Sequence, residues 1–283
     1  MKVKASAFLL FALAASLPTS AHAILNGGLE PTLTPLTPGQ VLAIGFLEDR
    51  DGFFCSGTVI RADVVLTAAH CVKDRLPEDI RFGIGPVSAP IGRLDVRRIS
   101  LAAEGTDIAL IELDGHATSV GGLQVIPINR VALNDDLVGE DVEIAGYGEI
   151  NGIALRRFVV MQVASVYERV AVDGDGERGA CMGDSGGPFL LVDDAGRVTV
   201  GGGLSKVLLS CLDEAYYTRI DLVASWVDEE LAWFDSNGGA GTPSQGTRMA
   251  DPWSCQAGGA STAVPIAMAL LAMLVGAAAR RRA

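Results

Sequence analysis

Residues 181–188 read Cys181-Met182-Gly183-Asp184-Ser185-Gly186-Gly187-Pro188, and this glycine-rich segment around one serine is the most informative part of the sequence. Because glycines lie close on both sides, nothing shields the serine hydroxyl and another group can approach the backbone closely. Such a turn can also direct N–H groups at a carbonyl oxygen. Taken alone, a serine in a glycine-rich turn is often only a turn, but the segment raises the hypothesis of a nucleophilic serine.

A serine nucleophile needs a base, and the chain has three histidines, His22, His70 and His116. His22 lies in an N-terminal leader, and His116 stands in a turn-like Asp-Gly-His-Ala context, where we expect a solvated loop residue. His70 ends an apolar, strand-like run and is therefore the candidate base, although a histidine beside a cysteine is often a core residue.

A histidine base needs an acid that fixes its tautomer and stabilises the imidazolium. The candidate is Asp107, which immediately precedes the apolar run Ile108–Ile111. An acid at the mouth of a buried strand is costly unless it is paired, although an aspartate there often only caps a turn.

In the order His70, Asp107, Ser185, these segments resemble the three signature blocks of the chymotrypsin/trypsin-like serine proteases. Two further stretches match the family, Cys55–Ile60 before the histidine block and Tyr216–Ile220 followed by a helix around Trp226. The resemblance covers about residues 24–234. It implies a serine endopeptidase that hydrolyses protein or peptide substrates through a Ser-His-Asp triad and an acyl-enzyme intermediate.

Short β-rich runs broken by Gly, Pro, Asp and Asn predict an all-β barrel or sandwich. The predicted strands are Val41–Phe46, Gly57–Ile60, Val64–Thr67, Ile108–Leu113, Val142–Ala145, Phe158–Val163, Phe189–Val192 and Val198–Val200. Four-residue apolar spacing predicts a helix over Asp221–Phe234. The resemblance implies a protease domain over residues 24–235 with two packed six-stranded antiparallel β-barrels, the first at about 24–135 and the second at about 136–235, and the triad in the cleft between them.

The resemblance also implies how the site is ordered. Gly183 and Ser185 would supply the N–H groups of the oxyanion hole. Residues 24–28, Ile-Leu-Asn-Gly-Gly, resemble the mature start of these proteases, in which a freshly cut N-terminal ammonium, here that of Ile24, pairs with the acid at Asp184.

Five cysteines are present, at positions 55, 71, 181, 211 and 255. The resemblance implies disulfides Cys55–Cys71 and Cys181–Cys211, each worth about 3–4 kcal/mol of stability by chain entropy. The alternative is five free thiols. Cys255 is left over, and it is free, inter-chain or part of tail processing.

The residue six before the serine, Gly179, would lie at the base of the primary specificity pocket, where an Asp selects Lys or Arg. With Ala180 beside it and Ala215 on the pocket wall, a cationic side chain would be buried unpaired. We therefore expect cleavage after small or apolar residues.

Further along the same wall, the resemblance places Ser205 beneath the Asp–His pair. Lys206 and Val207 would then lie near the pocket entrance. An inward-pointing Lys206 would instead favour acidic residues.

Residues 1–23 have the features of a secretory signal peptide, with Lys2 and Lys4, an apolar run over 7–17, and a small-x-small site ending at Ala23. The alternative is a membrane anchor. Cleavage after Ala23 would make Ile24 the first residue, so export itself would activate the enzyme.

The C-terminal end predicts membrane attachment. A Gly/Ser/Thr/Pro-rich linker over 236–262 leads to residues 263–283, an uncharged 17-residue run closed by three arginines. The run reads as a transmembrane segment, the alternative being a buried helix. With Gly258-Gly259 and Cys255, the tail resembles bacterial surface-sorting signals of the Gly-Gly type, cut by a rhomboid-like protease, or of a Cys-containing myxobacterial type.

Composition bounds the remaining possibilities. The 283 residues are 49% hydrophobic and 20% charged, which excludes general disorder, and a net charge of −12 leaves no basic footprint for nucleic acid. We find no metal or nucleotide motif and expect no cofactor. The chain is expected to be an exported monomer, at the cell surface or outside the cell, that meets export and tail-processing machinery. The alternatives are a catalytically silent binding protein on the same fold and a surface scaffold.

Overall fold

The computed structural model describes residues 24–150, 153–208 and 210–237, all within residues 1–246, the first of two units into which the chain divides. The predicted signal peptide, almost all of the predicted linker, the apolar C-terminal segment and Cys255 lie outside the described residues. Within the described ranges, no helix is long and apolar enough to cross a membrane.

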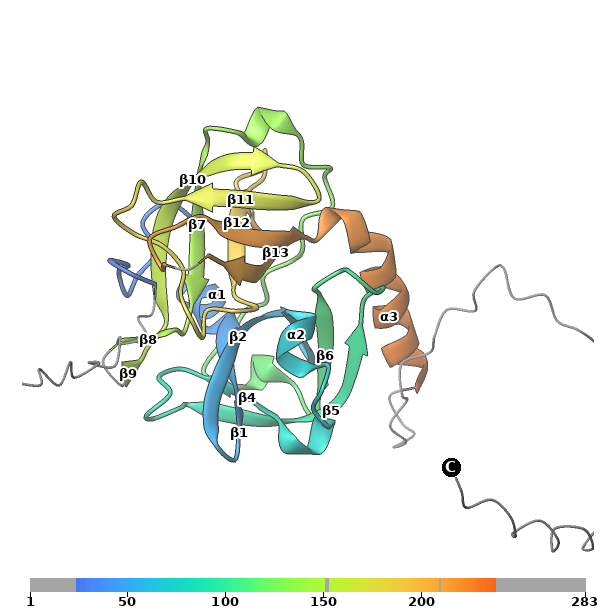
Figure 1. The fold of residues 1–283 in the computed structure, drawn as a ribbon. Coiled ribbons are helices and arrows are strands. Elements are labelled where there is room, and N and C mark those ends of the chain that lie inside the picture. The colour runs from blue at the N-terminus through green and yellow to red at the C-terminus, as the bar shows by residue number, and fades with distance from the viewer. Residues whose placement is uncertain (1–23, 151–152, 209, 238–283) are drawn as a thin grey trace, which may run out of the picture. The chain divides into compact units, whose positions relative to one another are not determined.

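The described residues form two closed, six-stranded antiparallel barrels, as expected (Figure 1). The first barrel has the strand order β1-β2-β3-β6-β5-β4. Its strands are β1 (Ile44–Asp49), β2 (Gly52–Arg61), β3 (Val64–Thr67), β4 (Arg81–Ile84), β5 (Gly92–Leu101) and β6 (Ala109–Leu113). Phe46 and Phe82 fill its centre, and each ring lies over a glycine of the facing strand where a Cβ would be about 2 Å from the ring.

The second barrel has the order β10-β11-β14-β13-β12-β7. Its strands are β7 (Asp141–Gly146), β10 (Arg157–Val166), β11 (Arg169–Asp173), β12 (Pro188–Val192), β13 (Val198–Val207) and β14 (Ala215–Arg219). A separate two-stranded sheet pairs β8 (Glu149–Ile150) with β9 (Ile153–Ala154).

Within the described residues, helices are few, and all but the last are short. They are α1 (Pro38–Ala43), α2 (Ala69–Val72) and α3 (Ala224–Asn237), with single 3₁₀ turns η1 (Pro77–Asp79), η2 (Ala117–Ser119), η3 (Asp135–Leu137) and η4 (Asp221–Val223). The predicted helix over 221–234 is thus a 3₁₀ turn followed by α3.

The predicted strand Val41–Phe46 is wrong for its first three residues, which belong to α1. Thr37 and Gln40 form a reciprocal capping box, and Pro38 occupies the first helical turn, so this end of the run is held as a helix. Strand β1 begins only at Ile44.

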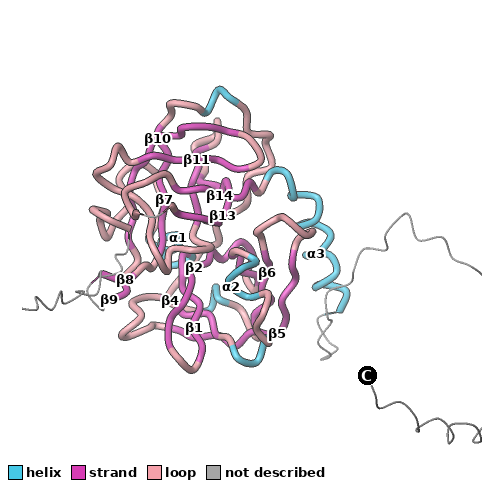
Figure 2. Tube along the Cα trace, in the orientation of Figure 1, coloured by secondary structure: helices cyan, strands magenta, loops and turns pink. Residues whose placement is uncertain are grey.

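Each end of the described chain packs on the barrel that is distant in sequence. Ile24 is fully buried in the core of the second barrel, and Leu25 pairs with Gly179 of that barrel's loops. Conversely, α3 packs on the first barrel, where Val227 and Phe234 join its core; Figure 2 shows the helix beside β5 and β6. Residues 24–28 therefore belong with the second barrel, and α3 with the first.

Candidate active site

The short helix α2 carries His70 to the side of the first barrel that faces the second (Figure 1). Its backbone N–H donates to Asp107 Oδ1 at 2.8 Å, and its Nδ1 lies 2.8 Å from Asp107 Oδ2. Ser205 on β13 donates its hydroxyl to the same Oδ2 at 2.7 Å. The carboxylate therefore holds both the backbone and the ring of His70.

The charge state of Asp107 fixes the tautomer of His70. Burial raises the pKa of Asp107, but hydrogen bonds from His70 and Ser205 outweigh it and hold the pKa below its ordinary value. An ionised carboxylate can only accept, so Nδ1 carries the proton and Nε2 keeps its lone pair. The imidazole side chain is 38% exposed, which leaves it reachable.

Ser185 lies three residues before β12, in the loop that leads into this strand. Its carbonyl accepts from the N–H of Ser56 at 2.8 Å, which ties it to the first barrel. Cys71 Sγ lies 3.8 Å from this carbonyl and 3.7 Å from His70 Nε2. The Ser185 backbone and the free nitrogen of His70 thus flank one sulfur atom.

The backbone N–H groups of Gly183 and Ser185, on either side of Asp184, differ from those of their neighbours. Asp184, Gly186 and Gly187 each donate their N–H to a backbone carbonyl. Among the residues that the structure describes, the N–H groups of Gly183 and Ser185 donate to no protein acceptor. Gly183 has φ of +91°, a conformation that glycine adopts without strain. The two free donors are available to a developing negative charge.

Asp184 points away from the surface into the second barrel. It is 1% exposed and accepts backbone N–H groups from Gly148 at 2.7 Å, from Cys181 at 2.8 Å and from Ile24. Burial raises the pKa of Asp184 to about 7, because these three bonds compensate only part of the desolvation. The Ile24 nitrogen and the Asp184 carboxylate are therefore brought together.

Two disulfides flank the site, Cys55–Cys71 on the first barrel and Cys181–Cys211 on the second. The ligand-type atoms of Cys55, His70 and Cys71 lie within 4.8 Å of one another, but both sulfurs are bonded to each other and are not thiolates. This cluster is therefore not a metal site in the oxidised chain.

The residues expected around the specificity pocket are tightly packed. Gly179, Ala180 and Ala215 are all buried. A Cβ on Gly179 would be 2.3 Å from the carbonyl oxygen of Cys211, so no side chain fits there without moving the disulfide. Ser205 contacts Asp107, and Lys206 beside it is exposed.

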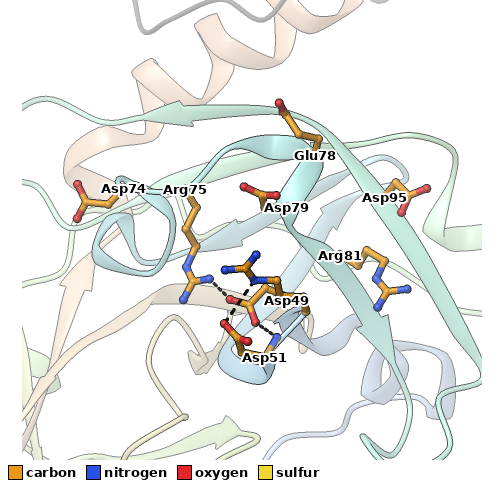
Figure 3. A pocket seen from close by; sticks show the side chains of 9 residues that line it. Asp49, Asp51, Asp74, Arg75, Glu78, Asp79, Arg81 and Asp95 are labelled. Carbon is orange, nitrogen blue, oxygen red and sulfur yellow. Dashed lines mark hydrogen bonds and ion pairs between the residues drawn. The ribbon is translucent and has the colours of Figure 1, made fainter.

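Other chemistry-bearing residues lie apart from this site. His116 is exposed in the loop before η2. A charged cavity of about 560 Å³ lies on the first barrel, where Asp49, Asp51, Asp74, Arg75, Glu78, Asp79, Arg81 and Asp95 surround it (Figure 3). Arg75 pairs with Asp49 inside it.

Ser56 was not predicted as a site residue from the sequence, although it lies in the matched stretch Cys55–Ile60. Ser56 is fully buried and bonds to both Gly183 and Ser185. Its position next to a cysteine of the site was the available signal.

Comparison with known proteins agrees with this geometry. The family model described as Trypsin matches residues 34–227. The chain is similar to the vitellin-degrading protease of Bombyx mori, with 29% identity over 257 residues that cover 79% of this chain and 92% of that protein. It is also similar to chymotrypsin-like elastase family member 1 of Felis catus, with 30% identity over 247 residues that cover 75% and 91%.

Among solved structures, human heparin binding protein has the same fold. The TM-score is 0.61 at 21% identity, and the match covers 78% of this chain and all of that one.

Proposed function

We infer that this chain, which belongs to the trypsin family and is a serine endopeptidase, cleaves peptide bonds with Ser185, His70 and Asp107 as its catalytic triad. The observation that carries the assignment is that His70 bonds to Asp107 twice, through its backbone N–H and through Nδ1, both at 2.8 Å. Because Nδ1 is engaged in this way, Nε2 is the only basic atom of the ring.

In the proposed mechanism, Nε2 of His70 takes the proton as Ser185 Oγ attacks the substrate carbonyl. Asp107 stabilises the imidazolium that forms. The oxygen of the tetrahedral intermediate accepts from the free N–H groups of Gly183 and Ser185. His70 then protonates the leaving amine, the acyl-enzyme forms, and water hydrolyses it by the same steps in reverse.

We propose cleavage after small or apolar residues. Gly179 has no side chain, and its close contact with the Cys211 carbonyl leaves no room for one. A lysine or arginine side chain of the substrate would therefore meet no acid at that position. The similarity to an elastase also supports it. Choices among apolar side chains of different size are worth only about 1–3 kcal/mol, so selectivity among them is broad.

The test is peptide-library profiling of a chain that starts at Ile24, beside its Ser185→Ala variant. We expect cleavage after residues such as alanine, valine and leucine by the parent and none by the variant. A preference for arginine or lysine contradicts the pocket assignment. A preference for acidic residues instead indicates an inward Lys206. A folded parent that binds peptides but never cleaves them contradicts the triad and supports a binding protein.

We further propose that the enzyme is exported and that removal of residues 1–23 activates it. The burial of Ile24 and the bond from its nitrogen to Asp184 support this, since a new ammonium at Ile24 would meet a buried carboxyl. Two disulfides are typical of an exported protein. N-terminal sequencing of the active species tests the idea, and a start other than Ile24 contradicts it.

The C-terminal residues 263–283 are proposed to tether the enzyme to the membrane before or instead of release. A chain that ends at residue 237 should then be found in the medium rather than in the membrane fraction. Equal membrane association of both chains contradicts tethering by this segment.

A further inference from the structure

We propose that Ser56 is a positioning residue that holds the oxyanion loop, Gly183 to Ser185, in its active arrangement from the opposite barrel. The inference rests on the proposed function, because it concerns the loop whose N–H groups bind the oxyanion there. Ser56 lies on β2 of the first barrel and is fully buried, whereas the loop belongs to the second barrel.

The side chain of Ser56 uses both its hydrogen-bonding functions. Its hydroxyl donates to the carbonyl of Gly183 at 2.9 Å and accepts from the N–H of Tyr147 at 2.9 Å. Its own N–H donates to the carbonyl of Ser185 at 2.8 Å, and its carbonyl accepts from the hydroxyl of Thr67 at 2.8 Å. One residue therefore bonds to both members of the proposed oxyanion hole.

Gly183 needs such a restraint. With no Cβ and a φ of +91°, its backbone can rotate with little steric penalty. The hydroxyl of Ser56 fixes the peptide plane after Gly183, and the ring of Phe53 closes the other side, where a Cβ on Gly183 would be 2.7 Å from the ring. Holding that carbonyl fixes one of the two peptide planes that meet at Gly183, and so removes one of the two backbone rotations at the residue that carries the free N–H.

The same hydroxyl joins the loop to the segment that anchors Asp184. Tyr147, which donates to Ser56, immediately precedes Gly148, which donates to the Asp184 carboxylate. The loop is thus fixed at two points, by Asp184 within the second barrel and by Ser56 from the first. Because a positioning bond only biases an equilibrium, its loss should cost less than loss of an oxyanion donor, which lowers kcat by about 10²–10³-fold.

The test compares Ser56→Ala with the parent, both starting at Ile24. We expect kcat for a peptide amide to fall by about tenfold, with KM within about twofold. The Ser185 hydroxyl adds to the carbonyl of a peptide aldehyde, and the former carbonyl oxygen of the hemiacetal then lies in the same oxyanion hole. Its affinity should therefore fall by a similar factor, while binding of the matching peptide acid, which forms no such adduct, should change little.

The matched control is Thr58→Val, two residues along the same strand. Its hydroxyl is also buried and, among the described residues, has no hydrogen-bond partner, so kcat should stay within about twofold of the parent. Ser56→Gly is the second variant, because it leaves space for a water between Tyr147 and Gly183 and so spares the fold. Its kcat should fall as well, since a water restrains the loop less than a fixed hydroxyl.

The proposal is overturned if a folded Ser56 variant loses thermal stability but keeps kcat and aldehyde affinity within about twofold of the parent. It is also overturned if Thr58→Val loses kcat to the same extent. A parent chain that is folded but hydrolyses nothing is a failure of the proposed function rather than of this inference.

Discussion

Asp107 is the residue on which the proposed chemistry depends. Its two oxygens accept from the backbone and ring of His70 and from Ser205, so neither the carboxylate nor the imidazole is free to turn. Asn at this position keeps the size of the side chain but presents an N–H₂ group to one of these donors.

We therefore predict that Asp107→Asn lowers kcat by about 10⁴-fold, because His70 would be held in the tautomer that has no lone pair at Nε2. Steady-state hydrolysis of a peptide amide measures this. Glu104→Gln, at an exposed acid three residues earlier, is the control and should leave kcat unchanged. A loss of less than tenfold in Asp107→Asn contradicts the assigned role.

Asp184 makes folding depend on pH. In a chain that retains residues before Ile24, burial raises the pKa of Asp184 to about 7 from an ordinary value of 3.8. The folded state then keeps a proton that the unfolded state releases. The contribution of Asp184 to the free energy of unfolding is therefore fully present below about pH 4 and is lost as the pH rises to about 7.

For that longer chain we predict that the free energy of unfolding falls by up to about 4 kcal/mol between pH 4 and pH 7 through Asp184. Urea unfolding at the two pH values measures the change. Asp184→Asn in the same chain should remove this part of the pH dependence. In a chain that starts at Ile24, the ammonium favours the ionised carboxylate, so this part should shrink or reverse. Identical pH profiles for all three chains contradict the pairing.

At the scale of elements, the segment from Ile24 to Thr34, which we call the strap, lies along the second barrel and bonds to it at several points. Its far end is held by Glu143 of β7, a fully buried carboxylate. Glu143 accepts the N–H groups of Thr32 at 2.6 Å, Leu33 at 3.3 Å and Thr34 at 2.9 Å, and also the hydroxyl of Thr34. Within the strap, Leu25 and Gly28 pair with loop and strand residues of the barrel.

We predict that Glu143→Gln lowers the free energy of unfolding by about 2–3 kcal/mol, because its N–H₂ group would face buried donors. Chemical denaturation measures the loss. The exposed Glu149→Gln on β8 is the control and should change stability by less than about 0.5 kcal/mol. Equal stability of the two variants contradicts the role of Glu143.

The apolar runs predicted some strands well and others not at all. Val64–Thr67 is strand β3 as predicted, and β6 starts one residue after the predicted Ile108. Strand β5 was missed because it carries four charged residues and only three of its ten residues are buried. Helix α1 was missed because its capping box, rather than its apolar residues, determines it.

For the candidate site, the segments around Ser185 and His70 were informative because the feature that marks each residue is formed by its neighbours in the sequence. The bond from Ser56 to Gly183 joins residues 127 positions apart, and no local pattern predicts such a contact. The same is true of Glu143 and the strap, where a glutamate in a strand pattern gives no indication of its distant partner.

At the scale of the whole described domain, the two barrels are held together because each end of the described chain packs on the barrel that is distant in sequence. The C-terminal helix α3 is fixed to the first barrel by Arg98, whose side chain is 3% exposed. Its guanidinium lies 4.3 Å from the ring of Trp233 and pairs with Glu112 at 3.5 Å. Arg61 adds a bond to the carbonyl of Leu231.

Because α3 follows directly from the second barrel, we predict that both barrels unfold in one transition. Arg98→Met should lower the stability of that transition by about 3 kcal/mol, since it leaves part of the buried Glu112 charge uncompensated. Far-UV circular dichroism and hydrolytic activity, followed through the same urea titration, measure this. The exposed Arg50→Met is the control. Two separate transitions in the parent contradict the coupling.

The activation of Ser185 by His70 and Asp107 is tested by labelling the chain that starts at Ile24 with a fluorophosphonate probe, followed by mass mapping of the modified peptide. An activated serine oxygen attacks the phosphorus of the probe, loses its proton and displaces fluoride, whereas an ordinary serine does not react. We predict one adduct, on Ser185, that is slowed strongly in Asp107→Asn and absent in Ser185→Ala. A folded parent in which Ser185 stays unmodified, or a Ser185→Ala variant labelled at the parent's rate, would mean that Ser185 is not the nucleophile.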